Sequence, residues 1–131
     1  MLFKGHKMEL QQEIELWYVI PALRKEIVIA LKKHNVKQKD IAAMLGLTGS
    51  AVSQYMNDKR ATCKFDESQA AIIKPEIDIA VKMVLAEKTP NPAVAMKEIN
   101  RICRLMREKK ITCAIHRKKN EGLCDCGVCY E

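Results

Sequence analysis

The sequence predicts an all-α protein: a bundle of helices followed by a long helix and an irregular cysteine-rich tail. Two observations support this fold class. Apolar side chains recur at three- and four-residue spacing through much of the chain, as one buried face of a helix requires. Residues that end or begin helices separate the periodic segments, with Gly46 after one and Pro92 at the start of another.

The first two periodic segments meet at Pro21. Residues 8–20 have apolar positions near helical spacing, and the restriction that a proline imposes on its predecessor predicts that Ile20 departs from helical geometry. A new helix is expected to begin at Pro21 and to run to about residue 34, as the first core helix. Trp17 is expected to pack either on its own domain or on a second subunit.

Residues 37–60 predict two short helices joined by a tight turn. Gly46 ends the first helix because glycine adopts the left-handed conformation that a helix C-terminus favours. Thr48 is placed to cap the second helix with its hydroxyl oxygen. The inward positions of that helix are Ala51, Val52, Tyr55 and Met56. A second helix with a small polar outer face, followed by Lys59 and Arg60, is typical of a recognition helix in the major groove of DNA.

The stretch KQKDIAAMLGLTGSAVSQYMNDKR resembles the helix-turn-helix of phage-repressor-like (Xre-type) regulators. More of the chain resembles small archaeal predicted transcriptional regulators, in which a phrase like LWYVIPALRKEI precedes this motif and cysteines gather at the C-terminus. The resemblance implies a repressor-like bundle that binds double-stranded operator DNA. A homodimer is expected, since one helix-turn-helix covers only one half-site.

The resemblance also implies a role for individual side chains. Gln38 would hydrogen-bond a phosphate, and Gln54 would be the best direct reader, since its amide can pair with an adenine edge. Gly49 departs from the pattern, because many relatives carry a long polar side chain there, which leaves more of the readout to Gln54, Ser50 and DNA shape. The implied DNA-binding residues are Gln38, Thr48, Gly49, Ser50, Ser53, Gln54, Asn57, Lys59 and Arg60.

Residues 66–88 again have helical spacing, with Pro75 inside. Either this proline kinks one helix or it begins a second one. A short helix to about Ile73, followed by a longer one from Pro75, is the favoured interpretation.

The sequence Thr89-Pro90-Asn91-Pro92 is the clearest boundary in the chain, and it divides a DNA-binding domain (1–88) from a C-terminal segment (89–131). Asn91 is a good N-cap and Pro92 a good first helical residue. In the helix that follows, about 92–109, Cys103 lies on the apolar stripe, so its thiol is expected to point into the protein or a partner.

All cysteines except Cys63 lie between Cys103 and Cys129, and residues 111–131 have no helical or strand period. In a reducing compartment such a cluster is more often a metal or redox site than a disulfide framework. The favoured ligand set for an iron–sulfur cluster is Cys103, Cys113, Cys126 and Cys129, with Cys124 as a spare thiolate for ligand exchange.

Two alternatives for the cysteines remain open. Cys113 and His116 would combine with Cys126 and Cys129 into a zinc knuckle, leaving Cys103 as a core thiol. The thiols would otherwise form regulatory disulfides without a metal. An iron–sulfur cluster would make the chain a redox, oxygen or iron sensor, whereas zinc would be structural.

The net charge of +7 is concentrated toward both ends of the chain, which fits a polyanionic partner. No apolar run approaches the length of a membrane span, and the N-terminus lacks a secretion signal, so a cytoplasmic location is expected. Nucleotide-binding and radical-chemistry motifs are absent from the sequence, so we expect no enzymatic activity. An antitoxin-type DNA-binding protein is the other alternative, and the cysteine-rich tail argues against it.

Overall fold

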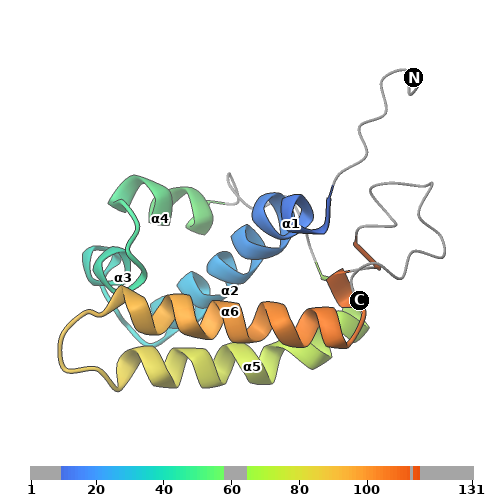
Figure 1. Ribbon diagram of the computed structural model, residues 1–131. Coiled ribbons are helices and arrows are strands. Elements are labelled where there is room, and N and C mark those ends of the chain that lie inside the picture. Colours follow the sequence, from blue (N-terminus) through green and yellow to red (C-terminus); the bar gives the residue numbers. More distant parts are fainter. Residues whose placement is uncertain (1–9, 58–64, 113, 116–131) are drawn as a thin grey trace.

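The structure, a computed structural model, describes residues 10–57, 65–112 and 114–115, and it confirms the all-α prediction for them (Figure 1). A short helix α1 (Gln11–Ile14) continues through a π-helical turn η1 (Glu15–Val19) into α2 (Ile20–Lys33). Two short helices follow, α3 (Gln38–Leu45) and α4 (Gly49–Met56). Two long helices complete the fold, α5 (Glu67–Leu85) and α6 (Pro92–Glu108). Residues 111–112 and 114–115 are also helical.

Helix α2 is the centre of the bundle, because it contacts α3, α4, α5 and α6. Helices α5 and α6 lie side by side, and α4 lies on the opposite side of α2 from α5 (Figure 1). Among the described residues, no helix combines the length and the apolarity that crossing a bilayer requires. The core draws on every helix, and its largest fully buried side chains include Ile14, Leu23, Ile27, Leu31, Ile41, Tyr55, Ile73, Ile102 and Met106.

The prediction that Ile20 leaves helical geometry was wrong. Its φ of −61° and ψ of −46° are helical, and its N–H donates to the carbonyl of Glu15 five residues earlier. A proline ring normally crowds the carbonyl four residues before it, which for Pro21 is that of Trp17. The wider π-helical turn at this point lets the helical path pass through Pro21 without a break.

The favoured interpretation of Pro75, two separate helices, was also wrong. Helix α5 is one helix from Glu67 to Leu85 with Pro75 inside it. Ile73 and Ile77 are both buried on the same stripe, so burial on either side of the proline favours a continuous helix. Pro75 and Ala71 are exposed, so water can reach the Ala71 carbonyl that the missing N–H leaves without its helical donor.

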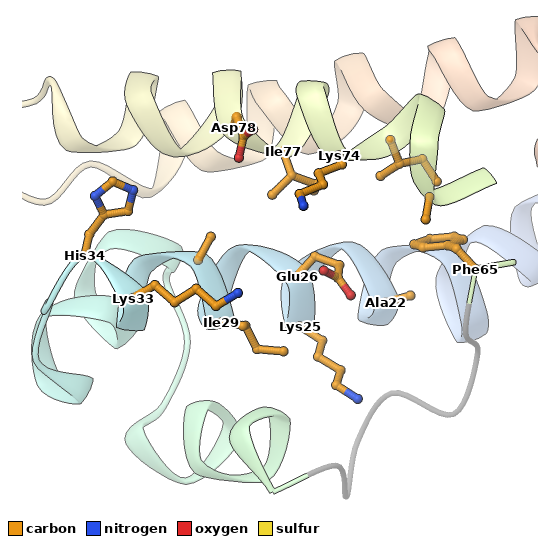
Figure 2. A pocket seen from close by; sticks show the side chains of 13 residues that line it. Ala22, Lys25, Glu26, Ile29, Lys33, His34, Phe65, Lys74, Ile77 and Asp78 are labelled. Atoms are coloured by element: carbon orange, nitrogen blue, oxygen red, sulfur yellow. The ribbon is translucent and has the colours of Figure 1, made fainter. Parts of the chain in front are cut away.

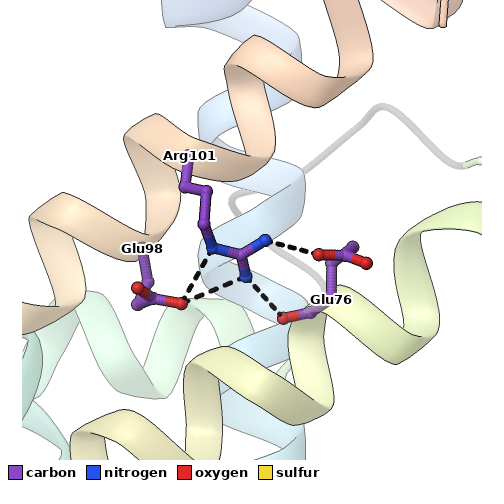
Figure 3. Close-up of polar contacts among 3 residues, drawn as sticks. All are labelled: Glu76, Glu98 and Arg101. Carbon is purple, nitrogen blue, oxygen red and sulfur yellow. Dashed lines mark hydrogen bonds and ion pairs between the residues drawn. The ribbon is translucent and has the colours of Figure 1, made fainter.

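Helix α6 begins as predicted and carries polar links to its neighbours. Asn91 caps it, with Oδ1 accepting from the Ala93 N–H at 3.2 Å, and Pro92 is its first residue. Arg101 joins α6 to α5: its guanidinium donates to the buried Glu98 (Nε to Oε1, 3.1 Å) and to the carboxylate of Glu76 (Figure 3).

A second polar link joins the same helix to the N-terminal segment. Nη1 of Arg107 lies 2.6 Å from Oε1 of Glu15 in η1. The inner face of α6 is therefore fixed at both ends. Arg107 contacts η1 at the C-terminal end, and Pro92 packs near the α3–α4 turn at the N-terminal end.

Candidate functional site

The turn between α3 and α4 requires a glycine for two separate reasons. Gly46 has φ 67° and ψ 34°, the left-handed conformation expected of it, and its N–H bonds the carbonyl of Ala42. In addition, a Cβ at Gly46 would lie 3.1 Å from the Cβ of Pro92 in α6. The turn is thus both a helix end and a close contact with the C-terminal helix.

Thr48 and three inward side chains fix the position and rotation of α4. The Thr48 hydroxyl oxygen accepts a hydrogen bond from the Ala51 N–H at 3.0 Å, which confirms the predicted N-cap. Ala51, Val52 and Tyr55 are buried, so the opposite side of α4 must face outward.

The outward side of α4 consists of small polar groups and bears no charge. Gly49 and Ser50 are exposed at its N-terminus, and Ser53 and Gln54 are half-buried. Asn57, just past the helix, is exposed, and its Nδ2 donates to Oγ of Ser53 at 3.4 Å. Nothing lies within 4 Å of a Cβ built at Gly49, so a side chain at this position would extend into open space.

Gln38 connects the beginnings of the two short helices. Its Nε2 donates to the carbonyl oxygen of Gly49 at 3.0 Å, across eleven positions in the chain. This contact was not expected from the sequence, which suggested only a phosphate partner for Gln38. It holds the N-terminus of α3 beside the N-terminus of α4, where backbone N–H groups and the helix dipoles favour an anion.

Two lysines that the sequence analysis did not single out flank Gln38. Lys37 occupies the N-cap position of α3 without a side-chain capping bond, Lys39 is in the first turn, and both are exposed. Their positions on either side of Gln38, which the sequence predicted to bind phosphate, could have identified them. The predicted cations after α4, Lys59 and Arg60, lie outside the described residues.

The cysteine cluster was predicted largely from residues that the structure does not describe: Cys113, His116, Cys124, Cys126 and Cys129. Cys103 is described, and it is 3% exposed on the inner face of α6. Burial raises the pKa of the Cys103 thiol to about 11, and the nearby Glu15 carboxylate adds to this, while Arg107 opposes it. The thiol is therefore neutral at ordinary pH when no metal is bound.

Two further observations concern this end of the bundle. The hydroxyl of Thr112 is fully buried and has no hydrogen-bond partner among the residues that the structure describes. Within the described part of the chain, no three His, Cys, Asp or Glu side chains gather closely enough to hold a metal ion.

A groove of about 770 Å³ runs between α2 and α5 (Figure 2). Ile29 and Ile77 are among its apolar lining residues, and Phe65 lies at one end (Figure 2). Lysines and acids line it as well, as Lys33 and Asp78 illustrate. This mixture favours no ligand of a single charge.

Comparison of the chain with protein-family models, with curated proteins and with solved structures found no match.

Proposed function

We propose that this protein is a sequence-specific, double-stranded DNA-binding transcription regulator that acts in the cytoplasm as a homodimer and has no enzymatic activity. The observation that carries the proposal is the uncharged polar side that α4 presents next to the N-terminus of α3. The Thr48 cap and the buried Tyr55 hold α4 in this orientation. In the proposal α3, the turn at Gly46 and α4 form a helix-turn-helix, and α4 enters the major groove.

The side chains divide into phosphate contacts and base contacts. Lys37 and Lys39 would bind phosphates on either side of Gln38 and so set the docking angle. Gln54 would read a base edge, with Ser50 and Ser53 as shorter-range partners in the groove. Since no charged residue lies in α4 itself, the electrostatic part of the affinity would come mainly from α3 and from the predicted Lys59 and Arg60.

We further propose that the C-terminal cysteines hold an iron–sulfur cluster that controls DNA binding. The burial of Cys103 on the inner face of α6 supports its alternative role as a core thiol. The fourth ligand beside Cys113, Cys126 and Cys129 would then be Cys124 in a cluster. With His116 in that place the site would be a structural zinc knuckle, which is the second candidate.

Helix α6 offers a route from such a site to the DNA-binding surface. It extends from the contact of Arg107 with Glu15 to the contact of Pro92 with Gly46 in the α3–α4 turn. A change in the tail that moves α6 would move Pro92 against the turn. A coupling of roughly 1–3 kcal/mol between the two sites would change operator affinity by about five- to 150-fold.

Two experiments test the two parts of the proposal separately. Duplexes selected from a random pool should converge on a motif, and Gln54→Ala should weaken binding to that motif about ten- to 100-fold, as expected for the loss of one bidentate base contact. Asn100→Ala, an exposed amide on α6, is the matched control and should bind as the wild type does. Selection without a motif would overturn sequence-specific binding.

For the metal, the protein should be purified without oxygen and its visible absorbance and metal content recorded. A coloured protein containing iron and sulfide is expected, and Cys103→Ala should retain it. A colourless protein with one zinc per chain would overturn the iron–sulfur sensor and would support a structural zinc knuckle.

A further inference from the structure

Helix α5 has a second apolar side in addition to the one buried in the core. Its inner stripe includes Ile73, Ile77 and Val84, which pack toward α2 and α6. On the outer side, large apolar residues recur at helical spacing and remain exposed: Ile72 is 37%, Ile79 45% and Met83 49% exposed. The exposed Pro75 lies within the same line, and Ala86, the residue that follows α5, continues it. The outer stripe therefore consists of Ile72, Pro75, Ile79, Met83 and Ala86.

A helix that is apolar on two opposite sides is typical of one covered on both. The outer stripe spans most of α5, whose 19 residues correspond to a length of about 28 Å. It lies on the side of the bundle away from α4, since α5 and α4 flank α2 on opposite sides in both Figure 1 and Figure 2. The proposed DNA-binding surface therefore does not compete for it.

The charged side chains beside the outer stripe would complement those of a second copy of the chain. Asp78 and Lys82 lie one turn apart on the same flank of the stripe, both are exposed, and neither forms an ion pair with another described residue. When two such helices pack antiparallel about a two-fold axis near Ile79, each flank faces the same flank of the other copy. Asp78 of one copy then faces Lys82 of the other, and the reverse pair forms at the same time.

We infer that the outer stripe of α5 binds the same stripe of a second copy of this chain, in an antiparallel, two-fold symmetric pair. Ile79 packs on Ile79 of the other copy at the centre, and Met83 packs near Pro75. The two Asp78–Lys82 contacts set the register, because displacement of one helix by a turn separates the opposite charges. A partner with charges of one sign would meet a like charge on this flank, which favours a second copy over a uniformly basic or acidic partner.

This arrangement gives the proposed homodimer a geometry that differs from the two adjacent half-sites expected from the sequence, and it rests on the proposed function in one respect, the use of α4 for DNA. The α5 pair holds the two α4 helices at opposite ends of the dimer, since each α4 lies on the far side of its own α2. Such a dimer binds two separate DNA segments and joins them, instead of occupying neighbouring grooves of one short duplex.

Self-association is measured first, without DNA, by sedimentation of the full chain. Wild-type protein should dimerise, and Ile79→Lys should weaken the dimer at least tenfold. Leu10→Lys, which also places a lysine at an exposed apolar residue but away from the outer stripe, should leave the dimer affinity unchanged. Circular dichroism of each variant should retain the helical signal, which separates loss of the interface from loss of the fold.

A charge exchange tests the register of the pair. Asp78→Lys places lysines against lysines twice and should weaken dimerisation about tenfold, and Lys82→Asp should do the same. The double variant Asp78→Lys, Lys82→Asp restores both opposite-charge contacts and should regain most of the affinity. A monomeric wild type, or a double variant weaker than both single variants, would overturn the α5 pair.

A capture assay tests the joining of two duplexes. Wild-type protein should retain a labelled duplex on beads that carry an unlabelled copy, and Ile79→Lys should lose this retention while still binding single duplexes. Binding without retention by a dimeric wild type would contradict the proposed geometry. Loss of all DNA binding would instead contradict the proposed function and leave the sedimentation result standing.

Discussion

Replacing Gly46 by alanine should destabilise the protein by about 1–3 kcal/mol. Gly46 has φ 67°, and an L-residue with a Cβ loses roughly 1–2 kcal/mol in this left-handed conformation. The new Cβ would also lie 3.1 Å from the Pro92 Cβ, so the turn or the start of α6 must shift by a few tenths of an ångström. Because the shift moves α3 against α4, the DNA affinity of Gly46→Ala should fall as well.

The measurement is urea unfolding followed by circular dichroism, with the free energy of unfolding compared at equal m-value. Gly49→Ala is the matched control, since Gly49 is within α4 and no atom lies within 4 Å of the new Cβ. Alanine there should leave the stability unchanged or raise it by up to about 1 kcal/mol. Equal stabilities for Gly46→Ala and the wild type would refute the account of the turn.

Three further predictions concern the other end of the bundle. Thr112→Val should raise the free energy of unfolding by about 1 kcal/mol, because it removes a buried hydroxyl that has no partner among the described residues. Urea unfolding that shows a loss of stability would mean that the hydroxyl is satisfied. The free energy of unfolding should fall as the pH rises from 9 to about 11, because the unfolded chain releases the Cys103 proton in this range while the native chain keeps it. Unfolding measured at several pH values should show a smaller fall for Cys103→Ala. Arg101→Ala should cost roughly 1–3 kcal/mol by leaving Glu98 buried without its partner, and adding Glu98→Gln should recover part of the loss; additive losses in thermal unfolding would argue against the link.

Local signals in the sequence predicted several element boundaries correctly. Gly46, Thr48 and Asn91 each act through their own backbone or through bonds to residues a few positions away, so their roles can be inferred from a short window. The spacing of Cys103 on the apolar stripe of α6 predicted that its thiol points into the protein or a partner, and it lies in the core.

The features that sequence reasoning missed depend on tertiary context. Pro21 and Pro75 remain inside helical segments because a π-helical turn accommodates one and burial on both sides of the other keeps its helix continuous. The bond from Gln38 to Gly49 joins two elements whose relative placement no local pattern specifies. Glu98 is buried and accepts a hydrogen bond from Arg101 in the next turn, a pairing that its position in the helix alone does not reveal.

The central claim is that the uncharged side of α4 reads base pairs. Its most direct test is the affinity of wild type and Gln54→Ala for a selected duplex and for a shuffled one, measured over a range of salt concentrations. The wild type should prefer the selected duplex by at least about a thousandfold. Gln54→Ala should lose most of that preference and keep the salt dependence that phosphate contacts confer. Equal affinity of the wild type for both duplexes would contradict the claim.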